Sequence, residues 1–223
     1  MNALDLLRAI VLLAGAYLLG SVPFGVVVAR LSGGPDPRTI GSGRTGGENT
    51  MRAIGPRLAL LSGLLDMCKG LAAVLISGAL GAGVEVQVLA GLAAVIGHSR
   101  SVFLGFGGGR GVAPAFGGLL GFQPLVAIVV VPVFAGVILV TRYSSAGSLL
   151  GSALGGVLMT AVVATQGLSP WLYVYSIGGP VLVWLFHRDN IVRLARGEER
   201  KVTFGRPAAG GGRSPRPGGT PPA

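Results

Sequence analysis

Three polar segments interrupt a strongly apolar chain, and each carries side chains that could bind an anion. The first, residues 40–52, places Ser42, Asn49, Arg44 and Arg52 among four glycines. Glycine allows close approach of the backbone to a ligand, and inward N–H groups can form a phosphate cradle. We favour a phosphate site here over a flexible connection, because a linker does not require arginine, asparagine and glutamate together.

The second segment, residues 97–112, combines Gly97-His98 with a Gly108-Gly109-Arg110-Gly111 run directly before an apolar stretch. Glycine-rich backbone entering a helix presents free N–H groups and the positive end of the helix dipole to an anion. Arg110 would add a bidentate phosphate contact. No Gly-Lys-Ser/Thr sequence follows, so this is not a Walker A loop. Close helix packing through small residues is the alternative.

The third segment, residues 186–199, follows the last apolar run. If it is helical, His187, Asn190 and Arg193 recur every three residues and share one face, whereas Asp189 lies elsewhere on the turn. This face would offer an imidazole, an amide and a guanidinium to a ligand. The alternative is an ordinary basic segment beside a membrane.

Two charged residues stand inside an apolar run. Asp66 and Lys69 are three residues apart, so they share a helix face, and pairing lowers the energetic cost of charges in a membrane. We predict a mutual ion pair with a structural role, holding this span against a loop. The two histidines are far apart and the one cysteine joins neither, so we expect no metal site and no cofactor. No nucleophile-elbow motif with a triad is present either.

The elements that carry these segments must be membrane helices. Of the 223 residues, 51% are hydrophobic and 12% are charged, against about 25% charged in soluble domains. A spanning helix needs about 20 mostly apolar residues. Apolar runs with few charges cover residues 6–29, 58–84, 86–97, 112–141 and 143–186, and the last two break at residues 121–124 and 166–170.

The net charge of +10 is distributed unevenly along the chain. Lys and Arg favour cytoplasmic loops, and all basic clusters share one side if the N terminus is outside and residues 112–141 cross twice. We therefore predict an all-α polytopic protein with about seven transmembrane helices, the fourth short and tilted or half-inserted. Six spans, with 112–141 as one tilted helix, is the alternative. Residues 1–204 would form one transmembrane domain, and residues 205–223 a disordered Pro/Gly/Arg-rich cytoplasmic tail.

Taken in order, the motifs resemble those of the bacterial membrane glycerol-3-phosphate acyltransferases that use acyl phosphate. The resemblance covers residues 20–199. It implies seven spans in the bacterial inner (cell) membrane and an active site on the cytoplasmic side. It also implies transfer of the acyl group of a fatty acyl phosphate to the sn-1 hydroxyl of glycerol 3-phosphate, which forms lysophosphatidic acid for phospholipid synthesis. The motifs are Gly20-Ser21-Val22-Pro23-Phe24-Gly25, Gly41-Ser42-Gly43 with Asn49 and Arg52, Asp66 with Lys69-Gly70, Gly97-His98, Gly108 to Ala113, and His187-Arg188 with Asn190 and Arg193.

The resemblance and the phosphate chemistry together suggest roles for individual residues. The first and second loops would grip the acyl phosphate, while the third segment and Arg110 would hold glycerol 3-phosphate. The proton of the hydroxyl would go to His187 or to the acyl phosphate itself. The expected partners are the two substrates, membrane lipid and an enzyme that makes acyl phosphate, with no nucleic acid. The catalytic candidates are His187, Asn190 and Arg110, and the substrate-binding candidates are Ser42, Gly43, Arg44, Gly46, Gly47, Glu48, Asn49, Arg52, Lys69, His98, Gly108, Gly109, Gly111, Arg193, Glu199 and, from the resemblance alone, Ser145 and Ser148.

The sequence departs from the family pattern at several positions. Arg44, Gly47 and Glu48 stand where the family usually has Asn, Ala and Thr, and Arg110 and Pro114 replace Lys and Thr. We expect Arg44, four residues before Glu48, to neutralise that carboxylate. Two other functions stay open: a transporter for an anionic or phosphorylated solute, and an inactive relative that binds lipid precursors.

Overall fold

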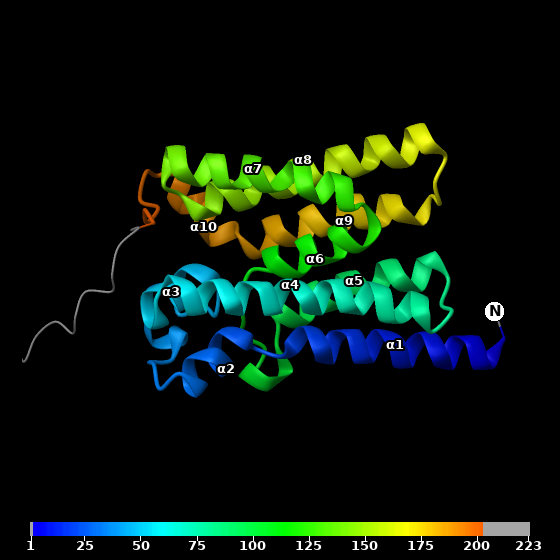
Figure 1. Cartoon of the computed structure of the whole chain (residues 1–223), viewed down its shortest axis with the longest axis horizontal. Helices are drawn as coiled ribbons and strands as arrows, with labels where there is room; N and C mark the ends of the chain where they lie inside the picture. Colours follow the sequence, from blue (N-terminus) through cyan, green and yellow to red (C-terminus); the bar gives the residue numbers. More distant parts are fainter. Residues whose placement is uncertain (1, 203–223) are drawn as a thin grey trace, which may run out of the picture.

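The computed structural model describes residues 2–202, and its regular elements are all helices (Figure 1). The predicted tail, residues 205–223, lies outside the described residues. The long helices lie side by side, with short helices gathered at one end of the bundle (Figure 1). The elements are α1 (Ala3–Ser21), α2 (Phe24–Leu31), η1 (Pro37–Thr39), α3 (Gly47–Ile54), α4 (Pro56–Ala79), α5 (Val84–Ser99), η2 (Val102–Leu104), α6 (Val112–Phe122), α7 (Pro124–Thr141), α8 (Ser144–Gln166), α9 (Trp171–Phe186) and α10 (Arg188–Ala195).

Seven of these helices are apolar. Within residues 2–202, α1, α4, α7 and α8 are long and apolar enough to cross a membrane, and α5, α6 and α9 are shorter apolar helices. Large side chains such as Leu125 and Val140 are exposed on their outer surface, as expected for a surface that faces lipid. The all-α membrane fold is therefore confirmed, while the number of crossings and their orientation stay predictions.

The apolar stretch 112–141 forms two helices, so the alternative with one long tilted helix is wrong. Helix α6 ends at Phe122 and α7 begins at Pro124. Gln123 between them is extended, with φ −142° and ψ 78°, because a residue that precedes proline avoids the helical region. Pro124 then opens α7, where its fixed φ suits the first turn. The expected break at residues 166–170 also occurs, between α8 and α9.

The first apolar run is also divided. Helix α1 ends at Ser21, and Pro23 separates it from α2. The carbonyl groups released at this break are bound by side chains: Lys69 Nζ donates to Val22 O at 2.8 Å, and Ser101 Oγ donates to Ser21 O at 2.6 Å. The predicted ion pair is confirmed, with 2.8 Å between Lys69 Nζ and Asp66 Oδ1. Lys69 thus ties α4 to the link between α1 and α2.

Helices α4 and α6 pack closely. A Cβ on Gly117 of α6 would overlap the carbonyl of Met67, and a Cβ on Gly70 of α4 would overlap the carbonyl of Pro114. Small residues at such crossings allow two backbones to approach within a membrane. This contact fixes the first turn of α6, which directly follows the second polar segment.

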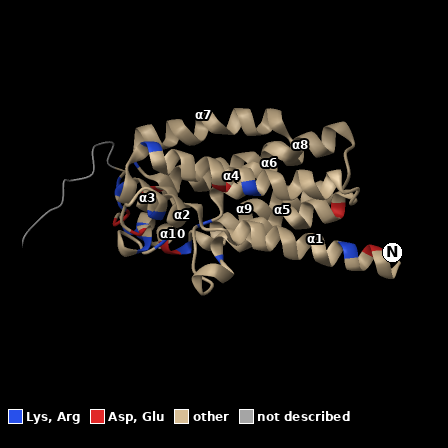
Figure 2. Ribbon diagram, turned by 60° about the horizontal axis from the view of Figure 1, so that its bottom comes forward, with Lys and Arg blue, Asp and Glu red and all other residues tan. Residues whose placement is uncertain are grey.

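Charged residues gather at the end of the bundle that holds α3 and α10 (Figure 2). The opposite end carries few charges, among them Asp5, Arg8 and Glu85 (Figure 2). All three polar segments lie at the charged end, which is the end that we expect to be cytoplasmic.

Candidate active site

The three polar segments meet around a cavity of about 130 Å³ at the charged end. These segments are distant in sequence, and the bundle brings them together. Its lining contains five arginines and three carboxylates, so it is a strongly charged hollow. The lining residues are Ser42, Arg44, Glu48, Asn49 and Arg52 from the first segment, Arg110 from the second, and Asp189, Asn190, Arg193, Glu199 and Arg200 at the third.

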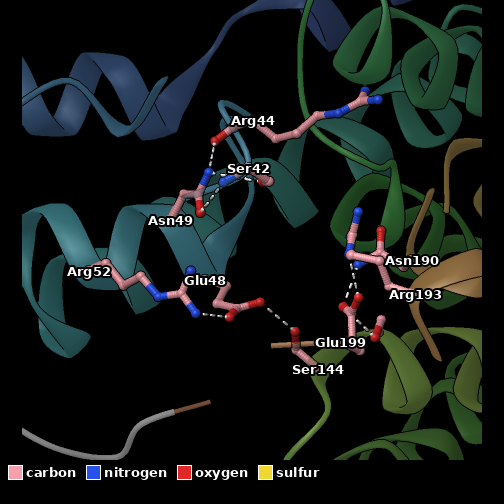
Figure 3. Close-up of polar contacts among 10 residues, drawn as sticks. Ser42, Arg44, Glu48, Asn49, Arg52, Ser144, Asn190, Arg193 and Glu199 are labelled. Carbon is pink, nitrogen blue, oxygen red and sulfur yellow. Dashed lines mark hydrogen bonds and ion pairs between the residues drawn. The ribbon is translucent and has the colours of Figure 1, made fainter. Parts of the chain in front are cut away.

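Asn49 organises the first loop from inside. Its Nδ2 donates to Ser42 Oγ at 3.1 Å and to the Arg44 carbonyl at 2.9 Å (Figure 3). Gly41 has a φ of +63°, and its Cα faces the Asn49 amide so closely that a Cβ would overlap it. Only glycine combines this conformation with this proximity. Asn49 therefore holds the loop in shape, and direct contact of its side chain with a ligand stays a prediction.

Glu48 is neutralised, but not by the expected residue. It pairs with Arg52 one turn later in α3, and its Oε2 accepts from Ser144 Oγ at 2.9 Å (Figure 3). The expected pairing with Arg44 is wrong, because α3 begins only at Gly47 and the spacing rule for helices does not apply across its start. Arg44 instead contacts Asp189, with 3.4 Å between Nη2 and Oδ2.

Glu199 joins the third segment to α8. Its Oε1 accepts from Asn190 Nδ2 at 2.6 Å and from Ser145 Oγ at 2.9 Å, and its Oε2 accepts from Arg193 Nε at 2.7 Å (Figure 3). Asn190 and Arg193 do share a face of α10, as the spacing predicts. Ser145 and Ser148 lie in the first turns of α8 and not in a loop. The connection is short, because only Arg142 and Tyr143 separate the end of α7 at Thr141 from the start of α8 at Ser144.

Asn190 and Arg110 each bring to the cavity a group without a partner within the described residues. Asn190 Oδ1 is buried and accepts no hydrogen bond there, which is unfavourable unless a ligand or water donates to it. Arg110 has no carboxylate ion-pair partner in residues 2–202, unlike Arg44, Arg52 and Arg193. Burial, followed by repulsion from Arg44, lowers the pKa of Arg110, although a guanidinium stays charged at neutral pH. Asn190 Oδ1 and the Arg110 guanidinium are thus both open to a ligand.

Arg110 lies at the junction of two cavities. It precedes Gly111, whose φ of +79° turns the chain into α6 at Val112. Val112 and Ala113 line a second, almost entirely apolar cavity of about 420 Å³ among α4, α6, α7, α8 and α9. Ser148 also lines this second cavity. A ligand with a phosphate and a long apolar chain could therefore occupy both.

His187 connects α9 to α10 and is 2% exposed. Its Nδ1 lies 2.8 Å from the carbonyl oxygen of Val183, so Nδ1 carries the proton of the neutral ring. Burial lowers the pKa of His187 to about 4. The imidazole is therefore neutral at pH 7, and it is not among the residues that line the polar cavity.

Other predicted residues lie beside the polar cavity without lining it. Lys69 and His98 are inside the bundle with Asp66, and the contact of either with a substrate stays a prediction. The predicted glycines contribute backbone groups to the first and second polar segments. They are Gly43, Gly46, Gly47, Gly108, Gly109 and Gly111.

Three residues at or beside the cavity were not predicted from the sequence: Asp189, Arg200 and Ser144. Asp189, which the spacing places elsewhere on the turn from Asn190 and Arg193, contacts Arg44 and lines the cavity. Arg200 lines the cavity, and Ser144 binds Glu48. Asp189 and Arg200 stand within or next to the third polar segment, which was the available signal, whereas Ser144 stands outside all three segments.

Known proteins resemble this chain over most of its length. The family model described as glycerol-3-phosphate acyltransferase matches residues 10–197. Glycerol-3-phosphate acyltransferase 3 of Dehalococcoides mccartyi is 41% identical over 205 residues, which cover 84% of this chain and 92% of the relative. The glycerol-3-phosphate acyltransferase of Azotobacter vinelandii is 44% identical over 185 residues, which cover 83% of this chain and 95% of the relative.

A crystal structure shows the same similarity in three dimensions. PlsY (YgiH), described as an integral membrane glycerol 3-phosphate acyltransferase in its glycerol 3-phosphate form, matches with a TM-score of 0.79 and 36% identity. The match covers 89% of this chain and 96% of that chain. The family implied by the motifs is therefore confirmed: this chain belongs to the glycerol-3-phosphate acyltransferases and is a multi-pass membrane enzyme.

Proposed function

We propose that this enzyme transfers the acyl group of a fatty acyl phosphate to the sn-1 hydroxyl of glycerol 3-phosphate at the bacterial inner membrane. The products are lysophosphatidic acid and inorganic phosphate. Residues 1–204 act as one transmembrane domain. The observation that carries the proposal is the polar cavity, where Arg110 has no ion-pair partner within residues 2–202 and Asn190 Oδ1 is an open acceptor, together with the apolar cavity that begins two residues after Arg110 at Val112.

Glycerol 3-phosphate fits the polar cavity by charge and by hydrogen bonding. Its phosphate pairs with Arg110, which has no carboxylate within ion-pair distance in the described residues, and a hydroxyl donates to Asn190 Oδ1. The Glu199 carboxylate holds Asn190 and Arg193 in place. PlsY has been crystallised in a glycerol 3-phosphate form and a lysophosphatidic acid form, which supports the same substrate and product for this relative.

The acyl phosphate places its two halves in the two cavities. Its hydrocarbon chain lies in the apolar cavity, and its phosphate lies near the start of α6, where backbone N–H groups and the helix dipole favour an anion. The glycine-rich loop before α6 and the loop of residues 41–46 grip this phosphate. The carbonyl carbon then lies between the cavities, next to the bound alcohol.

The reaction is a displacement at that carbonyl carbon. The sn-1 oxygen forms a bond to the carbon, the bond from carbon to the phosphate oxygen breaks, and inorganic phosphate leaves. A mixed anhydride has a good leaving group, so positioning and charge stabilisation supply most of the acceleration. The hydroxyl proton goes to a phosphate oxygen, because His187 with a pKa of about 4 is a weak base whose Nδ1 is already engaged.

The direct test is turnover by the purified protein in detergent. Radiolabelled glycerol 3-phosphate is supplied with palmitoyl phosphate or with palmitoyl-CoA, and a lipid product that forms only with palmitoyl phosphate supports the proposal. Flux of glycerol 3-phosphate into vesicles without any product would support a transporter. Binding without product or flux would support an inactive relative, for which the departures at Arg44 and Glu48 would then account.

Two substitutions test the site itself. Arg110→Ala and Asn190→Ala should each lower activity by about 10²-fold or more, in line with the loss of a group that stabilises a transition state. Arg57→Ala is the matched control, because Arg57 is exposed on the first turn of α4 at the same end of the bundle. Full activity in Arg110→Ala and Asn190→Ala would overturn the site assignment.

A further inference from the structure

A second charged cluster lies inside the bundle, where the reaction described above does not use it. Asp66 and Lys69 of α4 and His98 of α5 are 5%, 2% and 8% exposed. Asp66 Oδ1 lies 2.8 Å from Lys69 Nζ and 3.5 Å from His98 Nδ1. Lys69 Nζ also donates to Val22 O at 2.8 Å. Each member of the cluster is thus held by a neighbour on another turn or another helix.

His98 in turn supports the glycine loop that carries Arg110. The Gly109 N–H donates to the His98 carbonyl at 3.0 Å. A Cβ on Gly109 would overlap Nε2 of the His98 imidazole. The φ of Gly109 is not in the left-handed region, so the backbone does not itself require glycine here. The imidazole ring is what leaves no room for a side chain.

We propose that His98 is a positioning residue for Arg110, oriented by Asp66 and Lys69, and does not itself contact the substrate. The imidazole forms a flat support against Gly109, and Arg110 is the next residue. This inference rests on the proposed function, in which Arg110 binds substrate phosphate. It gives the buried cluster a role in substrate affinity as well as in stability.

The need for such a support follows from the surroundings of Arg110. Its guanidinium is partly buried and is repelled by Arg44, so a loose loop would allow it to move away from the site. The loop itself has no helical hydrogen bonds before α6 begins at Val112. Preorganised charges stabilise a transition state only when their positions are fixed, and a displacement of about 1 Å can lower a rate about 10²-fold.

A pair of substitutions at the contact tests the proposal. Gly109→Ala should raise the KM for glycerol 3-phosphate at least about tenfold, because the new methyl group displaces the loop from His98. His98→Ala should raise the same KM by a smaller factor, by removing the support. In the double variant the methyl group occupies the space of the ring, so its KM should be lower than that of Gly109→Ala alone. Such non-additivity is the signature of direct coupling.

Gly15→Ala is the matched control, because no atom lies within 4 Å of the position of its Cβ in α1. It should leave KM and kcat unchanged. His98→Asn provides a conservative rescue, because the Asn amide can donate to Asp66 from nearly the position of Nδ1. It should retain a KM closer to wild type than His98→Ala, at equal thermal stability in detergent.

The outcomes separate this proposal from the one on which it rests. The positioning role would be overturned if Gly109→Ala and His98→Ala changed the KM for glycerol 3-phosphate independently, so that the double variant had no lower KM than Gly109→Ala. The proposed site would still stand in that case if Arg110→Ala were inactive. Full activity of Arg110→Ala would overturn the proposed site instead. If Gly109→Ala does not fold, folded His98→Ala with an unchanged KM for glycerol 3-phosphate is sufficient to overturn the positioning role.

Discussion

The polar cavity and the buried cluster both contain ion pairs, but the surroundings of those pairs differ. In the cavity, Arg44 and Asp189 are 3.4 Å apart, with side chains 24% and 54% exposed. In the bundle, Lys69 and Asp66 are 2.8 Å apart, with side chains 1% and 7% exposed. Exposed pairs contribute little to stability because water and salt screen them. Buried charges that lose a partner are strongly destabilising.

This difference teaches which charges can respond to a substrate. A phosphate entering the cavity can replace a weakly bound carboxylate at Arg44 or Arg52 at small energetic cost. Lys69, by contrast, is almost fully buried beside Asp66. The exposed pair of Arg44 and Asp189 therefore suits exchange with a substrate, while the buried cluster serves as scaffold for the loop that carries Arg110.

The largest expected effect comes from breaking the buried cluster. Lys69→Met leaves Asp66 without its ammonium partner and removes the side-chain donor to Val22 O, so we expect a loss of about 3–5 kcal/mol in unfolding free energy. Thermal unfolding in detergent measures it. The double variant Asp66→Asn with Lys69→Met should be more stable than Lys69→Met alone. Equal stability of the two variants would contradict the scaffold role.

The next effect concerns His187, the buried residue between α9 and α10. Because its pKa is about 4 in the folded chain and about 6.5 when unfolded, the unfolded chain binds the proton first as pH falls. Stability is therefore complete above pH 6.5 and declines toward pH 4, by up to about 3 kcal/mol. His187→Gln keeps a donor for Val183 O and should flatten this decline. Melting temperatures of both proteins from pH 7 to pH 4.5 provide the comparison.

A smaller effect is expected at Glu48, where the carboxylate competes with substrate for Arg52. Glu48→Thr removes this competition and should lower the KM for acyl phosphate by about threefold to tenfold, equivalent to up to about 1.4 kcal/mol. The matched control is Glu198→Gln, since Glu198 is exposed and is not among the residues that line the cavity. A higher KM in Glu48→Thr would show that Glu48 assists binding instead.

The smallest effect is expected at the exposed pair. Asp189→Asn should change unfolding free energy by less than about 1 kcal/mol. It should also reduce the salt dependence of the KM for glycerol 3-phosphate, since Arg44 no longer has a carboxylate to exchange. Kinetics at about 50 mM and about 300 mM NaCl, roughly sixfold apart in ionic strength, measure this. A loss of stability as large as that of Lys69→Met would abolish the distinction between the two regions.

Much of the architecture could be predicted because it depends on local rules. The breaks at residues 121–124 and 166–170 follow from proline, glycine and polar residues between apolar runs. The ion pair of Asp66 and Lys69 follows from helical spacing. The apolar run 6–29 was not predicted to break at Pro23. The predicted pairing of Arg44 with Glu48 was wrong, because the start of α3 could not be located from spacing alone.

The sequence by itself determined that this is a membrane protein with charge at one end, and its motifs identified the family. Only the tertiary structure decided which charges pair, which acceptor stays open and which ring supports the arginine loop. Arg44 and Asp189 are 145 positions apart, and Gly109 meets His98 because α5 and the start of α6 both pack on α4. Periodicity and charge rules act over a helical turn or across one membrane span, whereas these contacts depend on the packing of several helices at once.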